Sequence, residues 1–271
     1  MKRKMLILGT IFFAVLIIVS GIMILRIYSD GKESEEAFES IVELIVEETI
    51  ADETTAPEIQ EPNEESTVPK KITPNEKYAS VYEQNNDFVG WISIDGTNIN
   101  YPVMQTVEHP NYYLKRGFDG KYSEHGVTYV QEDCDLLSSD NIVIYGHNMK
   151  DGTMFSDLEE YISEEFYKRY PYIQFDTLND YGTYVIIVVF KTVAYSEDGF
   201  KFYNFVDASD RAEFDNYISR CKELSLYDTG ISAEYGDKLL TLSTCEYSRN
   251  NGRMVIVAKL ITEDTEVDAD G

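Results

Sequence analysis

The sequence predicts a mainly β protein, a closed or nearly closed mixed barrel of about eight strands placed behind a single transmembrane helix. Apolar, β-branched runs recur between Val89 and Ile261, and the run at residues 181–195 is among the strongest strand predictions in the chain. Few segments between these runs have the spacing of a helix. One uncharged apolar segment stands near the N-terminus and predicts the tether.

Composition and charge limit the classes of function. The chain has 271 residues and a formal net charge of -26, which argues against a nucleic-acid partner because two polyanions repel each other. Its three cysteines, Cys134, Cys221 and Cys245, have no spacing suited to zinc and could form at most one disulfide. We expect no metal and no cofactor, and at least one free thiol.

The apolar segment covers residues 5–25, which as a helix would span roughly 30 Å, the thickness of a bilayer core. Lys2, Arg3 and Lys4 precede it and an acidic stretch follows, so the positive-inside rule places residues 1–4 in the cytoplasm and the catalytic region outside the cell. The run is longer than a signal-peptide core and lacks an A-x-A-like cleavage site. We therefore expect an uncleaved single-pass anchor over residues 5–27 of a cell-membrane protein.

An acidic extracellular linker is expected over residues 28–72. Residues 31–50 place apolar side chains at helical spacing among glutamates, which allows a short amphipathic helix serving as a solvated spacer. Residues 51–71 combine Pro, Glu and Thr without an apolar period and predict an extended, disordered linker. Together they would lift the domain at residues 73–262 off the membrane.

The first helix of that domain is predicted from Thr73 to about residue 86. Thr73 can serve as N-cap, Pro74 stands at the first helical position, and Glu76 completes a capping box. Strands follow at residues 89–94 and 97–104, joined by Asp95 and Gly96, a dipeptide typical of a hairpin turn.

The middle of the domain alternates short strands and brief helices. Strands are predicted at residues 126–130, 141–148, 172–177 and 181–195, and brief helices at 154–163 and 163–170. Ser163 can cap the second helix, although Phe166 stands where a capping box would need Glu or Gln.

A long insertion at residues 196–237 precedes the last hairpin and is too long for a plain loop. It contains one helical face, formed by Phe214, Tyr217, Ile218, Cys221 and Leu224. The acidic tail at residues 263–271 is expected to fray.

The last hairpin, residues 238–262, carries the most informative chemistry. Strand alternation puts Thr241, Ser243 and Cys245 on one face, and Arg253 opens the next strand after a polar loop containing Asn250, Asn251 and Gly252. Antiparallel pairing would bring the guanidinium close to the sulfur. A thiol attacks a carbonyl as the thiolate, so such assistance favours a nucleophilic role for the cysteine.

The other candidates are weaker. Cys221 lies on the apolar helix face and is expected in the core, whereas Cys134 stands among carboxylates that would raise its pKa. His109 and His125 lie in loops and are expected to be solvated, and Arg249 lies in mid-loop. His147 follows a strand and Gly146, at a strand end where sites are commonly built.

These residues together resemble the sortases, the membrane-anchored cysteine transpeptidases of Gram-positive cell envelopes, and look most similar to class B. The resemblance is carried by TLSTC ending at Cys245, Arg253 eight residues later, YGHN around His147, and the order His, Cys, Arg. The helix ahead of the barrel and the helix-bearing insertion are also similar to class B. The resemblance covers roughly residues 74–261.

The resemblance implies an eight-stranded sortase barrel with Cys245 as nucleophile, His147 as general acid and base, and Arg253 stabilising the oxyanion or positioning substrate. The implied reaction cleaves the C-terminal sorting signal of a surface protein, of the N/S-P-x-T-x type, after Thr. A thioacyl intermediate would then pass to an amine of a lipid-linked peptidoglycan precursor. The resemblance also implies substrate contacts from Tyr145, Ser243, Glu246, Leu114 and a residue near Tyr203, and no acidic cluster suggests the calcium site of class A.

Two alternatives remain open at this point. An L,D-transpeptidase also uses His, Cys and Arg in that order, but it expects glycine before the cysteine and arginine two residues after it. Here Thr244 and Tyr247 occupy those positions. A membrane-anchored interaction domain without catalysis would instead bury Cys245.

Overall fold

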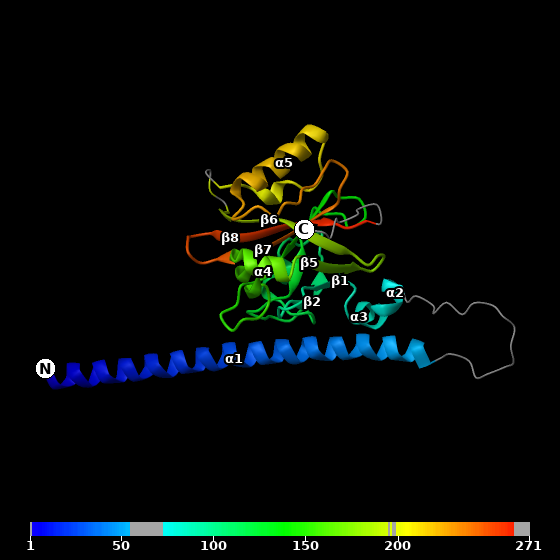
Figure 1. Ribbon diagram of the computed structural model, residues 1–271. Helices are drawn as coiled ribbons and strands as arrows, with labels where there is room; N and C mark the ends of the chain where they lie inside the picture. Colours follow the sequence, from blue (N-terminus) through cyan, green and yellow to red (C-terminus); the bar gives the residue numbers. More distant parts are fainter. Residues whose placement is uncertain (1, 55–72, 195, 197–198, 263–271) are drawn as a thin grey trace.

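The computed structural model describes residues 2–54, 73–194, 196 and 199–262, and it contains a closed barrel of eight strands (Figure 1). The strands are β1 Phe88–Ser93, β2 Asn100–Met104, β3 Thr128–Val130, β4 Asn141–Tyr145, β5 Tyr172–Thr177, β6 Thr183–Val193, β7 Leu239–Glu246 and β8 Gly252–Leu260. Their order around the barrel is β1-β2-β3-β4-β7-β8-β6-β5. The pairs β2 with β3 and β4 with β7 are parallel and the others antiparallel, which confirms the predicted mixed barrel.

The helices and turns of 3-10 helix lie around this barrel. They are α1 Lys2–Thr54, α2 Pro74–Lys77, α3 Ala79–Gln84, η1 Tyr112–Lys115, η2 Ser156–Ile162, α4 Glu164–Arg169, η3 Phe202–Asn204 and α5 Arg211–Leu224. Strands β7 and β8 are buried over most of their length, so the two strands that carry the cysteine and the arginine run through the core.

The predicted capping box at the start of the domain is present, but the helix is shorter than expected. Thr73 accepts a hydrogen bond from the N–H of Glu76, whose side chain bonds back to the N–H of Thr73. The helix breaks at Tyr78, which separates α2 from α3. The ring of Tyr78 is buried against Trp91, and its hydroxyl donates to Asp176 at 2.7 Å. This tertiary contact outweighs the local preference for a continuous helix.

The helix of the insertion is α5, with the predicted face packed against the barrel. Phe214, Tyr217, Ile218 and Cys221 are buried, and Tyr217 stacks on Phe205 with ring centroids 4.0 Å apart. Figure 1 shows α5 lying on the side of the barrel opposite α1. Of the two brief helices, the first is the 3-10 helix η2, and Ser163 caps α4 by accepting from the N–H of Phe166.

The N-terminal helix α1 differs from the prediction in two ways. It is continuous through Thr54, so the residues from 51 to 54 are helical rather than extended, and the remaining predicted linker at 55–72 lies outside the described residues. Its face is also not fully solvated, because Phe38 and Ile41 are buried and the Phe38 ring meets Tyr101 edge-on at 5.3 Å. The predicted solvated spacer is therefore wrong: burial of these apolar side chains docks the helix on the barrel.

The sequence predicts that residues 5–27 cross a membrane. Within the described part of the chain, no helix has a stretch both long and apolar enough to cross a membrane, and the anchor predicted over residues 5–27 stays a prediction.

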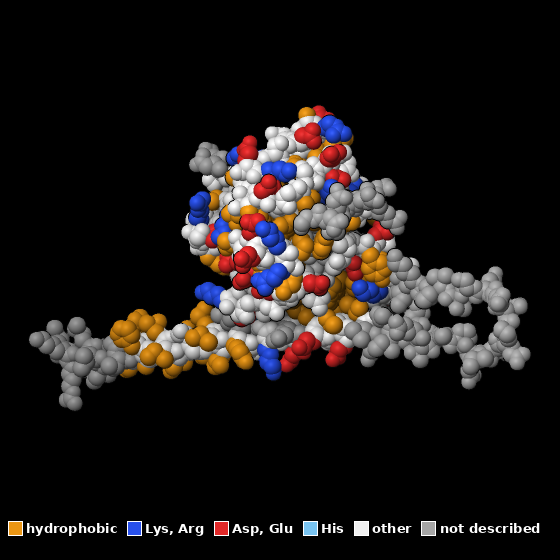
Figure 2. All heavy atoms as spheres, viewed as in Figure 1, with side chains coloured by type: hydrophobic (Ala, Val, Ile, Leu, Met, Phe, Trp, Pro, Cys, Tyr) orange, Lys and Arg blue, Asp and Glu red, His pale blue; other side chains and the backbone are white. Residues whose placement is uncertain are grey.

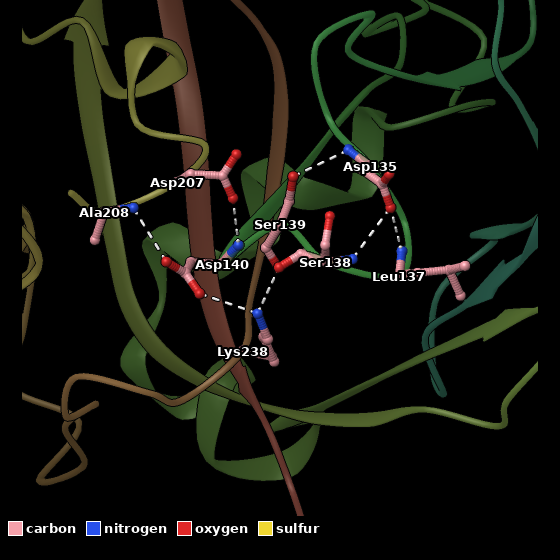
Figure 3. A network of polar contacts seen from close by, with 8 residues as sticks. All are labelled: Asp135, Leu137, Ser138, Ser139, Asp140, Asp207, Ala208 and Lys238. Carbon is pink, nitrogen blue, oxygen red and sulfur yellow. Dashed lines mark hydrogen bonds and ion pairs between the residues drawn. The ribbon is translucent and has the colours of Figure 1, made fainter. Parts of the chain in front are cut away.

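A polar network fixes the N-terminal ends of β4 and β7 (Figure 3). Lys238 Nζ, just before β7, lies 3.0 Å from Asp140 Oδ1, just before β4, and donates to the carbonyl of Ser138 at 2.7 Å. Asp140 Oδ2 accepts from the N–H of Ala208 at 3.0 Å. Burial would raise the pKa of Asp140, but the hydrogen bonds from Ala208 and Lys238 outweigh it and hold the pKa below its ordinary value. These contacts fix the register of the two strands at the end opposite the candidate site.

Candidate active site

Strands β4, β7 and β8 are neighbours in the barrel and lead His147, Cys245 and Arg253 into one cleft. The last pair of the parallel strands β4 and β7 is Tyr145 with Ser243, and His147 and Cys245 each stand two residues beyond it. In the antiparallel pair of β7 and β8, Cys245 lies directly opposite Arg253. Residues paired in this way project to the same face of the sheet. The hairpin pairing predicted from the sequence is therefore confirmed.

The three side chains line one cleft of about 490 Å³. Its other walls come from η1, the end of β3, and the segment around η3 in the insertion.

His147 is held by a backbone carbonyl across the cleft. Its Nε2 lies 2.6 Å from the carbonyl oxygen of Leu114, and because a carbonyl only accepts, Nε2 carries the hydrogen. Nδ1 is then the ring nitrogen that can take or give a proton. Burial lowers the pKa of His147 below 6.5, and Lys115 and His125 add to this effect, whereas the Leu114 carbonyl and Glu124 oppose it. The imidazole is therefore mostly neutral at pH 7.

Gly126, which lies just before β3, allows its backbone to pack closely against the carbonyl of Leu114. Gly126 has a φ of +60°, and a Cβ there would lie 2.7 Å from the carbonyl oxygens of Tyr113 and Leu114. The N–H of Val127 donates to the Tyr113 carbonyl at 3.2 Å. Only glycine fits this conformation and this spacing, so Gly126 fixes the carbonyl that orients His147.

Cys245 differs from the two other cysteines in exposure. All three are free thiols, but Cys134 and Cys221 are buried and Cys245 is half-buried at the cleft. Burial raises the pKa of both Cys134 and Cys221 to about 12, with Asp133, Asp207 and Glu132 adding to the effect at Cys134. Both thiols are therefore protonated at pH 7, which leaves Cys245 as the thiol with access to a substrate.

Arg253 lies opposite Cys245 on the neighbouring strand and supplies a cation to the same cleft. Its Nη1 donates to the carbonyl of Gly252 at 2.9 Å, which anchors the guanidinium, and the residue lines the cleft. Arg249, the competing cation, is exposed in the β7–β8 loop and does not line the cleft.

Four of the five predicted substrate-contact residues line the cleft, namely Leu114, Tyr145, Tyr203 and Ser243. The buried hydroxyl of Ser243 has no hydrogen-bond partner among the described residues. An unpaired buried hydroxyl is costly unless a ligand satisfies it, so Ser243 is well suited to bind a peptide group.

Glu246 does not line the cleft, and its predicted contact with substrate stays a prediction. Strand alternation turns it away from the face of Cys245, and it is 6 % exposed. Its carboxylate lies 3.3 Å from Lys191 Nζ and accepts hydrogen bonds from the backbone and hydroxyl of Ser248. Glu246 therefore organises the start of the β7–β8 loop.

The two other histidines lie outside the cleft. His109 is exposed, as predicted. His125 was expected to be solvated, but it is 2 % exposed and its Nε2 lies 2.8 Å from Asp151 Oδ2. Asp151 is 26 residues away in the sequence, so the local pattern around His125 could not reveal this partner.

Two residues at the site were given no role from the sequence. Gln131 lines the cleft, where its Nε2 donates to the Tyr203 carbonyl at 2.9 Å and its Oε1 accepts from the Tyr145 hydroxyl. Asn148 follows His147 directly, and its Nδ2 donates to the carbonyl of Cys245 at 2.9 Å. The only sequence signal for a role of these two residues was their position at the end of a predicted strand. Within the described residues, no group of three or more His, Cys, Asp or Glu side chains is placed to hold a metal ion.

The arrangement supports acyl transfer through a thioester. A thiolate can attack a carbonyl carbon, a guanidinium can stabilise the resulting oxyanion, and a neighbouring imidazole can protonate the departing amine. The half-buried, accessible sulfur argues against a domain without catalysis.

Comparisons with known proteins agree with this chemistry. A sequence profile of the sortase domain matches residues 92–261. Sortase B of Staphylococcus aureus (strain NCTC 8325 / PS 47) is 28% identical over 262 residues, covering 96% of this chain and 98% of that protein. Sortase B of Listeria monocytogenes serovar 1/2a is 31% identical over 183 residues, covering 66% of this chain and 72% of that protein. The crystal structure of sortase B from B. anthracis is similar with a TM-score of 0.68 and 28% identity, covering 87% of this chain and all of that one.

Proposed function

The chain belongs to the sortase family as a cysteine transpeptidase similar to class B, and from this premise we propose its substrates and its place in the cell. The proposed substrate is a surface protein with a C-terminal sorting signal of the N/S-P-x-T-x type, cleaved after Thr. The proposed acceptor is an amine of a lipid-linked peptidoglycan precursor. The enzyme would act from a membrane anchor, with its barrel outside the cell.

The observation that carries this proposal is that His147, Cys245 and Arg253 line one cleft, where Cys245 lies directly opposite Arg253 in the β7–β8 pair. In the first step neutral His147 takes the proton of the Cys245 thiol, the thiolate bonds to the carbonyl carbon of the signal's Thr, and Arg253 stabilises the oxyanion. The C–N bond then breaks, and protonated His147 gives its proton to the leaving amine. The product is a thioester on Cys245 and a released C-terminal peptide.

The second step reverses these roles. Neutral His147 takes a proton from the acceptor amine as its nitrogen attacks the thioester, and the C–S bond breaks to regenerate the thiolate. One amide is exchanged for another, so the reaction needs no cofactor to balance electrons. Because an amine must outcompete water, transfer is favoured over hydrolysis when the bound peptide and acceptor exclude water from the cleft.

Leu114, Tyr145, Tyr203 and Ser243 are the side chains proposed to hold the peptide. Leu114 and the two tyrosines supply apolar surface along the cleft, and Ser243 supplies an unpaired hydroxyl. A proline-containing signal is an extended segment, since the residue before proline favours β or polyproline conformation. Such a peptide presents its carbonyl groups at regular spacing to the cleft.

We expect the full chain to cleave a peptide with Asn-Pro-x-Thr-x after its Thr, and hydroxylamine to convert the product to a hydroxamate. Mass spectrometry identifies both products. A peptide in which Ala replaces Thr is the matched control and should be cleaved at least about tenfold more slowly, because a misplaced scissile carbonyl loses alignment. Equal cleavage of both peptides, or cleavage at another bond, contradicts the proposed signal.

The membrane anchor is supported by the N-terminal part of α1. The large apolar side chains exposed between Ile11 and Leu25 have exposed fractions from 46% to 72%, and Figure 2 shows apolar side chains gathered along this end of the helix. An apolar surface of this kind is unfavourable in water and favours insertion into lipid. The basic residues at positions 2 to 4 favour a cytoplasmic N-terminus.

We expect the full chain to float with phosphatidylcholine vesicles in a density gradient. The double variant Ile17→Lys with Ile18→Lys should stay at the bottom, because each lysine in a membrane span costs about 2.5 to 3.5 kcal/mol. Ile17→Leu with Ile18→Leu is the matched control and should float. Recovery of the parent chain at the bottom of the gradient would rule out the anchor.

A further inference from the structure

The regular pairing of β4 with β7 ends before the two residues that carry the proton and the acyl group. The last residue pair is Tyr145 with Ser243, followed by a hydrogen bond from the N–H of Gly146 to the carbonyl of Ser243 at 3.2 Å. His147 and Cys245 both lie beyond this point. Backbone pairing alone therefore does not fix their relative position.

Three side-chain hydrogen bonds continue the connection where the ladder ends. Thr244 Oγ1 donates to the carbonyl of Gly146 at 2.8 Å, and Asn148 Nδ2 donates to the carbonyl of Cys245 at 2.9 Å. The hydroxyl of Tyr247 donates to the carbonyl of Asn148 at 2.7 Å. The segment around His147 is thus joined to the segment around Cys245 on both sides of the two reacting residues.

Asn148 is the central member of this connection. It is 8 % exposed, and the same Nδ2 that contacts Cys245 also donates to Glu159 Oε1 at 2.9 Å. Both partners are acceptors, so the amide must present its nitrogen to them, and its two N–H groups are both used. The Glu159 carboxylate holds the amide in the one orientation that reaches the nucleophile's own carbonyl.

The backbone around His147 is also held in place. The N–H of Phe155 donates to the carbonyl of His147 at 2.8 Å, and a Cβ on Gly146 would lie 2.6 Å from the Phe155 ring. The turn that carries His147 is therefore packed against Phe155, and Asn148 transmits this fixed position to Cys245.

We propose that Asn148 is a positioning residue for the transpeptidase reaction: it holds the backbone of Cys245 at the level of His147, and Glu159 orients its amide. Misplacement of reacting groups by about 1 Å can cost on the order of 100-fold in rate. The inference rests on the cysteine transpeptidase chemistry and not on the identity of the sorting signal.

The variant Asn148→Asp tests this directly because it keeps the shape of the side chain and removes both donors. We expect the rate constant of thioacylation to fall by about 10- to 100-fold, while KM for the peptide changes less than about twofold. Alkylation of Cys245 by a methanethiosulfonate needs no peptide, and its pH profile should move away from that of the parent. The same change at the exposed Asn179 is the matched control and should leave all three quantities unchanged.

A second substitution separates positioning from stability. Asn148→Asp places a carboxylate beside Glu159 and should lower the melting temperature. Adding Glu159→Gln supplies a donor to the new carboxylate, so the melting temperature should recover while the lost donor to Cys245 keeps the rate constant low. Tyr247→Phe removes a hydrogen bond at the protein surface and should lower the rate constant by about three- to tenfold with KM unchanged.

The proposal is overturned if Asn148→Asp keeps a rate constant within twofold of the parent together with an unshifted alkylation profile. It is also overturned if the double variant recovers the rate constant along with the melting temperature. If the parent does not turn over the Asn-Pro-x-Thr-x peptide, the proposed signal fails, while the alkylation profiles still decide the role of Asn148.

Discussion

Replacing Cys245 with alanine should abolish thioacylation, with a loss of at least about 10³-fold in kcat/KM for the peptide, because no other accessible thiol lies in the cleft. Cys134→Ala and Cys221→Ala should retain most activity per folded molecule. Both of these thiols are buried and their pKa is raised to about 12, so neither supplies a thiolate at pH 7. Peptide cleavage followed by chromatography measures all three variants.

The two buried cysteines serve as matched controls with a measurable cost of their own. Each of these two alanine substitutions removes a sulfur from the core, so we expect a lower melting temperature without a change in KM. Full activity in Cys245→Ala would eliminate the nucleophile assigned to the reaction. Loss of activity in Cys134→Ala at an unchanged melting temperature would show that the wrong thiol was chosen.

Replacing His147 with glutamine should lower kcat/KM by about 10²- to 10⁴-fold, the usual contribution of general acid and base catalysis. Glutamine can keep a hydrogen bond to the Leu114 carbonyl but cannot move a proton at neutral pH. The loss should therefore fall on kcat more than on KM. Cleavage rates over a range of peptide concentrations separate the two constants.

The pH dependence follows from the burial of the imidazole. Burial lowers the pKa of His147 below 6.5, so the acid limb of kcat/KM should lie below that pH. Below this pKa the imidazole and the thiol both hold their protons and the enzyme is inactive, and activity rises as one proton leaves the pair. An NMR titration of His147 should give the same pKa as the acid limb. A midpoint above 6.5 contradicts this assignment, as does an unchanged acid limb in His147→Gln.

Much of the fold follows from local signals in the sequence. The polar loop ending at Gly252 leaves few ways to pair the last two strands, so the opposition of Cys245 and Arg253 could be predicted from the hairpin alone. The capping box of Thr73 and Glu76 and the buried face of α5 are local patterns of the same kind. Each depends on residues within one or two turns of each other, which is why sequence reasoning succeeds there.

Contacts between segments that are distant in the sequence could not be predicted from local patterns. His125 is buried because Asp151 is brought to it by the fold, and Phe38 is buried because α1 docks beside Tyr101. These partners lie far apart in the sequence, and no periodic pattern or motif connects them.

The position of Glu246 outside the cleft could have been predicted from the sequence. Alternation already places it on the opposite face from Cys245, yet the family resemblance suggested contact with substrate. The bond of Asn148 to the Cys245 carbonyl depends on parallel pairing of β4 with β7, and a parallel register has no hairpin to fix it in the sequence.

Intact-protein mass spectrometry after rapid quenching in acid tests the central claim most directly. The parent chain mixed with the Asn-Pro-x-Thr-x peptide should gain the mass of the acyl fragment ending in Thr, and digestion should locate it on Cys245. The adduct should disappear on addition of hydroxylamine, as expected for a thioester. An adduct on another residue, or turnover of the peptide without any adduct on Cys245, would contradict the account.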